Sequence, residues 1–214
     1  MSITLYTNPF SRGRAIHWLL EELAVPYRIE LLDFARGQHK TPQFLAINPM
    51  GKVPAIVHET NGQSVVVTES AAICCYLADA FPGRGLAPPI GSPLRAAWLR
   101  WMFFAAGCLE PAVMDQFFPR AQPAREGSLG YGSLRSVMTT LDDVIGTGWL
   151  LGNDFSSLDV YLGSTLHWAQ MVKAIVPTPK MSAYVARCEA RPSWKRMSDQ
   201  SAGMAAELQP QTTN

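Results

Sequence analysis

The chain has 214 residues, of which 48% are hydrophobic and 16% charged, an ordinary balance for a globular protein with a substantial core. Its formal net charge is +1 and like charges form no run, so nothing indicates a nucleic-acid or membrane-surface partner. No segment approaches the roughly 20 apolar residues of a membrane span, and the N-terminus lacks a signal-peptide pattern. We therefore expect a cytoplasmic protein.

The cysteines do not form a metal-binding pattern. Cys74 and Cys75 are adjacent, Cys108 and Cys188 stand alone, and the sequence has no C-x-x-C. We expect no metal, and reduced thiols that are mostly buried on helices.

The first eighty residues alternate strand and helix patterns. Predicted strands cover residues 3–6, 27–31, 55–57 and 64–67. Predicted helices cover residues 15–23, 41–47 and 69–81. Asn61-Gly62 is a hairpin-turn signal between the last two strands. The order βαβαββα predicts a small α/β domain over residues 1–81.

The pattern changes after this domain. Residues 82–93, PGRGLAPPIGSP, are rich in proline and glycine and predict a linker. The later apolar residues repeat with helical spacing and show no strand pattern. These helical segments cover residues 94–118, 133–145, 158–176 and 180–191. We predict an all-α domain over residues 94–214.

Three motifs resemble those of the cytosolic glutathione transferase superfamily: NPMGKVPAIV at 48–57, TESAAICCYLAD at 68–79 and FSSLDVYLG at 155–163. The resemblance covers essentially the whole chain, and GQH at 37–39 with GKVP is most similar to theta-type and related bacterial enzymes. It implies a thioredoxin-like N-terminal domain and a helical C-terminal domain. It also implies a homodimer that takes glutathione as co-substrate and a small apolar electrophile as substrate, with a role in detoxification.

Pro54 opens a predicted strand, where its missing N–H leaves a gap in the ladder. In the family the peptide bond before this proline is cis, which turns the N–H and C=O of Val53 outward. An extended tripeptide such as glutathione then pairs with them as an added strand. The alternative is a trans proline in an edge strand.

The resemblance places the ends of glutathione near four other side chains. Lys52 meets the terminal carboxylate, unless it is simply a solvated lysine. His39 lies in the loop that contacts the glycine end in theta-like enzymes, and its alternative role is structural. Ser70 and a helix N-terminus bind the γ-glutamyl carboxylate, and Glu69 faces the ammonium group; a plain N-cap is the alternative here.

The thiol-activating group is expected in TNPFSRGRAIHW, residues 7–18. Glutathione's thiol ionises near pKa about 8.5, so the enzyme needs a hydrogen-bond donor aimed at its sulfur. Ser11 is the hydroxyl beyond the end of the strand and is the predicted catalytic donor; its alternative role is a helix N-cap. Tyr6, Asn8 and Arg12 are the other candidates. The segment has no cysteine, which argues against a mixed-disulfide mechanism.

The motif FSSLDV is interpreted as a folding element. Ser156 and Asp159 have the spacing of a capping box, and Phe155 and Val160 that of a hydrophobic staple. The predicted function is therefore glutathione transfer to an electrophile. A glutathione-dependent isomerase or dehalogenase, or a catalytically silent protein-binding module, are the alternatives on the same fold.

Overall fold

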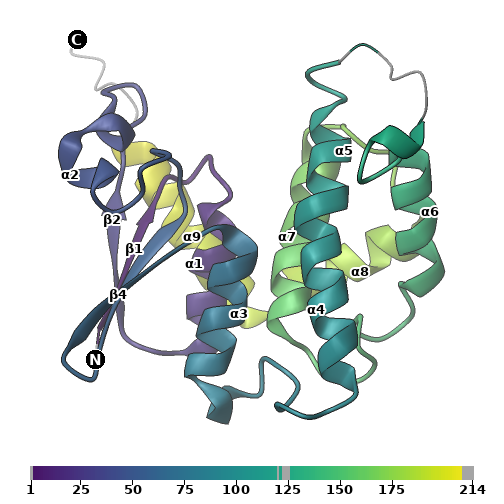
Figure 1. The fold of residues 1–214 in the computed structure, drawn as a ribbon, viewed down its shortest axis with the longest axis horizontal. Helices are drawn as coiled ribbons and strands as arrows, with labels where there is room; N and C mark the ends of the chain where they lie inside the picture. The colour runs from purple at the N-terminus through teal and green to yellow at the C-terminus, as the bar shows by residue number, and fades with distance from the viewer. Residues whose placement is uncertain (1, 120, 122–125, 209–214) are drawn as a thin grey trace. The chain divides into compact units, whose positions relative to one another are not determined.

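A computed structural model describes residues 2–119, 121 and 126–208 (Figure 1). The described chain forms two compact units, residues 2–77 with 191–208 and residues 78–190 with the gaps just given. The C-terminal segment from Arg191 thus belongs to the first unit, whereas the sequence analysis places it in the helical domain. The boundaries expected from the sequence, residues 1–81, 82–93 and 94–214, therefore remain a prediction.

The first unit is built on a mixed sheet with the strand order β2-β1-β3-β4. The strands are β1 (Ser2–Thr7), β2 (Tyr27–Leu31), β3 (Ala55–Thr60) and β4 (Gln63–Thr68). β1 pairs parallel with β2 and antiparallel with β3, and β3 pairs antiparallel with β4. Asn61 and Gly62 have φ of 52° and 73°, as a tight hairpin turn requires. All four predicted strands are present.

Four of the described α-helices belong at least partly to the first unit. They are α1 (Gly13–Leu23), α2 (Pro42–Leu45), α3 (Ser70–Ala80), which continues into the second unit, and α9 (Pro192–Glu207). In α1 the predicted stripe Ile16, Leu19, Leu20 and Leu23 is fully buried. The sequence analysis did not anticipate α9, which lies on α1 through a ring contact of 4.8 Å between Trp18 and Trp194.

The second unit is helical, and its described residues contain no strand beyond one isolated bridge between Trp149 and Gly152. Its α-helices are α4 (Leu94–Phe104), α5 (Glu110–Met114), α6 (Leu134–Val144), α7 (Ser157–Met171) and α8 (Pro179–Glu189). A π-helical segment, Ala105–Leu109, interrupts the long helix predicted over 94–118. Pro111 lies two residues after this segment, and because its ring excludes the carbonyl four residues before it, the wider turn accommodates it. The linker adopts a short 3₁₀ turn, Pro82–Arg84, and no α-helix.

The predicted capping box is confirmed at the start of α7. Asp159 is fully buried, and its carboxylate accepts hydrogen bonds from Ser156 N (2.9 Å), Ser156 Oγ (3.0 Å), Leu150 N (2.9 Å) and Tyr184 Oη (2.8 Å). Burial raises the pKa of Asp159 although these bonds oppose the shift. The pair is a folding element that also ties α7 to α8.

Candidate functional site

The sheet topology brings the predicted site residues to one edge of the first unit. β1 and β2 run parallel and end at this edge, while β3, antiparallel to both its neighbours, begins there and β4 ends there. The register places Tyr6 and Thr68 on either side of Ala55. The loops at this edge carry Ser11, His39, Lys52, Val53, Pro54, Glu69 and Ser70.

The turn that enters β3 presents Val53 without internal partners. The peptide bond between Val53 and Pro54 is cis, as the resemblance implies. Buried Asn48 holds the turn, since its Nδ2 donates to the Lys52 carbonyl (2.7 Å) and its Oδ1 accepts from Met50 N (3.1 Å). Among the described residues, no hydrogen bond involves the backbone N–H or C=O of Val53. Both groups are free to pair with an extended ligand.

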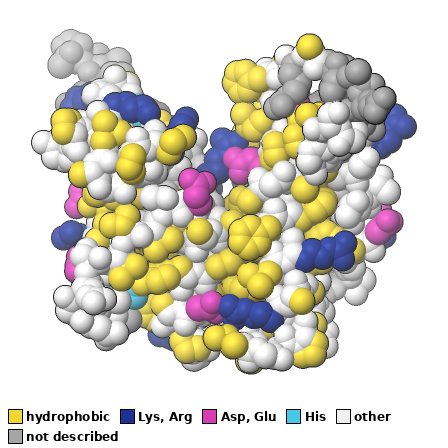
Figure 2. All heavy atoms as spheres, in the orientation of Figure 1, with side chains coloured by type: hydrophobic (Ala, Val, Ile, Leu, Met, Phe, Trp, Pro, Cys, Tyr) yellow, Lys and Arg dark blue, Asp and Glu magenta, His cyan; other side chains and the backbone are white. Residues whose placement is uncertain are grey.

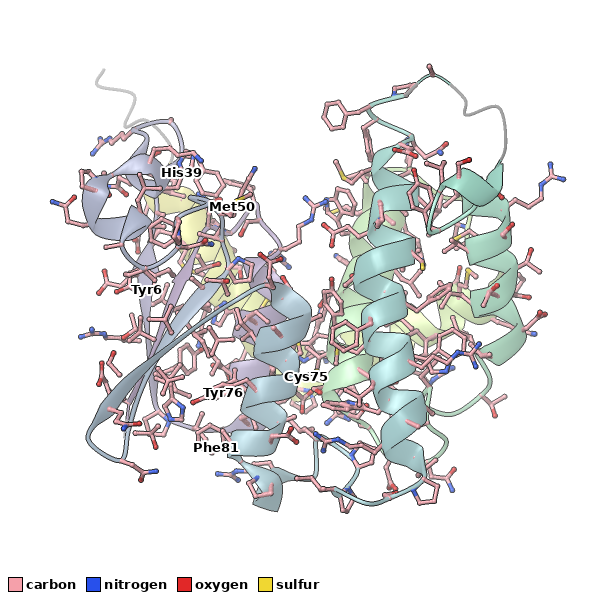
Figure 3. All side chains as sticks on the ribbon, in the orientation of Figure 1. Tyr6, His39, Met50, Cys75, Tyr76 and Phe81 are labelled. Carbon is pink, nitrogen blue, oxygen red and sulfur yellow. The ribbon has the colours of Figure 1, made fainter. Side chains whose placement is uncertain are left out.

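Gly51 brings the loop of His39 against the loop of Lys52. Gly51 has φ +59°, and a Cβ there would lie 2.7 Å from the His39 carbonyl oxygen, so the close approach requires glycine. Lys40 Nζ donates to the Met50 carbonyl at 2.9 Å and joins the same two loops. In Figure 3 the labelled His39 and Met50 lie at the same end of the unit.

His39 and Lys52 differ in how firmly they are held. The His39 ring packs against Phe34 at 4.9 Å between centroids, and its Nδ1 is buried without a hydrogen-bond partner in the described chain. The Lys52 side chain is exposed and makes no ion pair or hydrogen bond with any residue that the structure describes. The edge therefore presents one fixed ring and one mobile cation to a ligand.

Glu69 has a backbone conformation that side chains rarely adopt, with φ 68°. It lies between Thr68, which ends β4, and Ser70, the first residue of α3, and its carbonyl accepts from Ile73 N at 2.9 Å. Within the described residues, neither its exposed carboxylate nor the Ser70 hydroxyl has a partner. A carboxylate beside a helix N-terminus can receive both charges of an amino acid head group.

Ser11 is positioned by the loop that follows β1. Its Oγ donates to the Asn8 carbonyl at 2.7 Å and accepts from Gly13 N, the first residue of α1, at 3.0 Å. The N-cap residue of α1 is Arg12, so Ser11 satisfies an N–H at the start of the helix from one position before the predicted N-cap role. A bond from Ser11 to a ligand sulfur would replace its bond to Asn8.

Comparisons with known proteins identify the family. The glutathione S-transferase N-terminal domain model matches residues 1–79. Glutathione S-transferase GST-4.5 of Xanthomonas campestris pv. campestris is 31% identical over 186 residues, which are 84% of this chain and 87% of that protein. The chain belongs to the glutathione S-transferase family.

Other members of this glutathione S-transferase family agree in fold but differ in name. The disulfide-bond oxidoreductase YfcG of Escherichia coli is 30% identical over 203 residues, 89% of this chain and 92% of the relative. A glutathione transferase homolog from Sulfitobacter, solved with bound glutathione, is 28% identical with a TM-score of 0.72. That likeness covers 95% of this chain and 99% of the other. The fold is therefore the thioredoxin-like plus helical fold of this family.

The alternatives to Ser11 in this family member occupy different surroundings. Asn8 is buried, its Nδ2 donates to the Leu32 carbonyl (2.8 Å) and its Oδ1 accepts from Phe10 N (2.9 Å). The amide is thus committed to holding the loop. Tyr6 is half-buried in β1, and its ring lies 5.7 Å from that of Phe44 in α2. Asn8 supports the loop, and Tyr6 is still a candidate for thiol activation.

The site edge combines cations with exposed apolar side chains. Phe10 is 73% and Met50 is 65% exposed. On the face drawn in Figure 2, apolar side chains and Lys or Arg side chains both appear at the end of the unit where α2 lies. The described residues contain no group of three or more His, Cys, Asp or Glu that could hold a metal ion. None of the described helices is long and apolar enough to span a bilayer.

Several residues that build this edge escaped the sequence analysis. They are Asn48, which holds its own turn, Lys40, which joins two loops, and Glu69 with its αL backbone. Asn48 precedes a proline, which is a general turn signal but does not indicate which groups it will hold.

Proposed function

We propose that this family member binds glutathione at the edge described above and activates its thiolate for attack on a small hydrophobic electrophile. The observation that carries the proposal is the pairing of two features at one edge. The backbone of Val53 has no partner within the described chain, and Glu69 is held at the start of α3 with its carboxylate exposed. The glutathione-bound Sulfitobacter homolog supports the choice of ligand.

Each part of the tripeptide has a matching group. The backbone of Val53, set by Pro54, pairs with the cysteinyl residue as an added strand. Glu69 pairs with the γ-glutamyl ammonium, and Ser70 with the N–H groups of α3 binds its carboxylate. Lys52 and His39 bind the glycine carboxylate.

Ser11 supplies the chemistry in this proposal. By donating its hydroxyl proton as a hydrogen bond to sulfur, it favours the thiolate, and the thiol proton leaves to solvent. The thiolate forms a carbon–sulfur bond with the electrophile, and the leaving group departs with the bonding electron pair. The serine does not act as a base because its own pKa is far too high.

The binding half of the proposal is tested by calorimetric titration with glutathione. Glu69→Gln keeps the size of the side chain but removes its charge, so we expect affinity to fall roughly tenfold or more, as for a lost charge-assisted hydrogen bond. Glu59→Gln is the matched control, because Glu59 is exposed near the opposite end of β3 and should bind like wild type. Equal affinities for all three proteins would contradict the placement of the site. Absence of binding by wild type would favour a silent protein-binding module.

A second function is favoured by the relative YfcG, a disulfide-bond oxidoreductase at 30% identity over most of the chain. In that reaction two glutathione molecules reduce a disulfide: a thiolate attacks one sulfur, the second glutathione resolves the mixed disulfide, and two thiols and oxidised glutathione result. No protein cysteine is needed, in keeping with the first loop. Parallel assays with an aryl halide and a small dialkyl disulfide decide between the two reactions.

The proposal also includes a homodimer that works in the cytoplasm. A symmetric pair is the commonest assembly of soluble oligomers. Light scattering coupled to size-exclusion chromatography measures its mass directly, and a monomer mass at micromolar concentration would remove this part of the proposal.

A further inference from the structure

The α9 helix is held on α1 and β2 by a polar cluster centred on one buried histidine, with exposed partners on α9. We call it the His17 clasp; its members are His17, Glu21, Tyr27, Arg196 and Gln200. His17 is 1% exposed, and its Nε2 lies 3.0 Å from Tyr27 Oη and 2.5 Å from Gln200 Oε1. None of these residues belongs to the proposed glutathione site, so the clasp has a separate purpose.

The bonds around Glu21 determine which nitrogen of His17 carries its proton. The Glu21 carboxylate accepts from Tyr27 Oη (2.5 Å), from Arg196 Nε (2.6 Å) and from Gln200 Nε2 (3.3 Å). Tyr27 therefore donates its hydroxyl hydrogen bond to Glu21. The amide oxygen of Gln200 faces His17. Since His17 Nε2 faces two oxygen acceptors, it must be the protonated nitrogen.

The other ring nitrogen cannot accept a second proton without cost. His17 Nδ1 is buried and has no hydrogen-bond partner in the described chain. A proton there would create a buried, unpaired N–H on a charged ring. The clasp thus stabilises the neutral form of the His17 ring and destabilises its protonated form.

We propose that the His17 clasp is an acid-sensitive latch that releases the part of α9 from Arg196 onward when His17 is protonated. The first turn of α9 stays in place, because it is anchored by contacts that do not involve His17. Arg191 pairs with Glu22 (2.5 Å), and Trp18 Nε1 donates to Ser193 Oγ (3.1 Å). The proposal is independent of the function proposed for the glutathione site.

The charges facing His17 act in both directions. Burial, the largest effect, and the nearby Arg14 lower the pKa of His17, whereas the bond to Gln200 and the charge of Glu21 raise it; the net direction is down. Tyr27 stays protonated, because burial and Glu21 raise its pKa, and Glu21 stays ionised, because its bonds to Tyr27 and Arg196 outweigh burial and lower its pKa. Arg196 is a permanent cation on α9.

The sign of the pH effect follows from these directions. With α9 docked, the pKa of His17 is below its free value of about 6.5, so the docked state binds fewer protons than the released state. The contribution of His17 to docking is fully present above that pH. Below it, the equilibrium constant for docking falls by at most about tenfold per pH unit. Between pH 7.5 and 5.5 we expect the release equilibrium to rise by up to about tenfold.

Hydrogen–deuterium exchange tests the latch at pH 7.5, 6.5 and 5.5, with rates corrected for the intrinsic pH dependence of exchange. In wild type, protection of residues 196–207 should fall by up to about tenfold relative to α7. His17→Gln retains an N–H donor but cannot titrate in this range, so its α9 protection should be independent of pH. His167→Gln is the matched control; His167 pairs with Glu189 in the second unit, and this variant should respond like wild type.

The outcomes that overturn the latch are specific. A flat response in wild type, or an equal response in wild type and His17→Gln, rules it out. Unchanged protection from pH 7.5 to 5.5, with release only at lower pH, would assign the effect to protonation of Glu21, whose pKa is lowered, instead of His17. If His17→Gln does not fold, an NMR titration of the wild-type ring decides: a His17 pKa above about 6.5 contradicts the proposal.

Discussion

At the scale of single residues, the Ser11 hydroxyl has two possible partners for one proton. In the structure it donates to the Asn8 carbonyl and accepts from Gly13 N. Catalysis by this group requires the donated bond to move to the glutathione sulfur. The hydroxyl is bonded within its own loop, and the proposed catalytic role requires the bound ligand to compete with Asn8.

Replacing Ser11 with alanine separates these roles. Loss of the bonds to Asn8 and Gly13 should lower the free energy of unfolding by about 1 kcal/mol. Loss of the bond to sulfur should raise the pKa of the bound thiol and reduce kcat/KM with an aryl halide by roughly one to two orders of magnitude at neutral pH. Higher pH should restore part of the activity, because more of the unassisted thiol then ionises. The pH profile of kcat/KM measures both effects.

Two controls make this test specific. Glutathione affinity should be nearly unchanged in Ser11→Ala, since other groups hold the ends of the tripeptide. If the pH profiles of wild type and Ser11→Ala coincide and stability alone falls, Ser11 has a structural role only. The same measurement is then made on Tyr6→Phe.

Gly51 offers a second residue-scale prediction. Gly51→Ala combines a positive φ with a Cβ that would lie 2.7 Å from the His39 carbonyl, so we expect a loss of about 2–4 kcal/mol in urea unfolding. Gly62→Ala is the matched control: its φ is +73° but no atom lies within 4 Å of the added Cβ, so the cost should be about 1–2 kcal/mol. Equal losses would show that the contact between the two loops adds nothing.

At the scale of elements, the start of α7 depends on Asp159 more than its sequence motif indicates. A capping residue contributes about 1 kcal/mol, but this carboxylate also satisfies Leu150 N and Tyr184 Oη in the interior. Asp159→Ala should therefore lower stability by about 3–5 kcal/mol, as when one member of a buried network is removed. Ser156→Ala, which removes one donor, should cost about 1 kcal/mol.

Denaturant unfolding measures this difference, and activity per folded molecule is the control. The folded fraction of Asp159→Ala should conjugate glutathione like wild type if the wild-type protein does so. A well-folded variant that has lost turnover would show that Asp159 is a catalytic acid.

The sequence predicts those elements whose signals are local. β2 has the predicted bounds, and the Asn61-Gly62 turn follows from two residues that tolerate positive φ. α9 was missed because its buried stripe, Trp194, Met197 and Ser201, is narrow and includes a polar residue, although Pro192 at its first turn is a helix-start signal. The π-helical segment was missed because periodicity alone does not show how a helix accommodates Pro111.

The candidate site shows the same limit. Motifs identify Val53, Pro54, Glu69 and Ser70, and parallel or antiparallel pairing then places them at one edge. The close approach of His39 to Gly51 arises from a tertiary contact, and the αL conformation of Glu69 has no glycine or asparagine to signal it. Such contacts leave no periodic trace in the chain.

At the scale of the whole molecule, the last helix returns to the first unit rather than extending the helical one. The sequence pattern does not predict this, because a helical segment has the same periodicity whether it packs on its own unit or on α1 of the other unit. If α9 packs with the first unit, a substitution in α9 should destabilise that unit. If residues 94–214 form a single domain, the same substitution should destabilise the helical unit.

Trp194→Ala tests that grouping. Trp194 is 7% exposed and its ring meets that of Trp18 edge to face, so its truncation should cost about 3–5 kcal/mol. If α9 is part of the first unit, hydrogen exchange should accelerate in residues 2–77 and leave α6, α7 and α8 close to wild type. Phe118→Ala is the control, because that side chain is 71% exposed and its loss should change stability by less than about 0.5 kcal/mol. Acceleration centred on α6, α7 and α8 would instead assign α9 to the helical domain and support the boundary predicted from sequence.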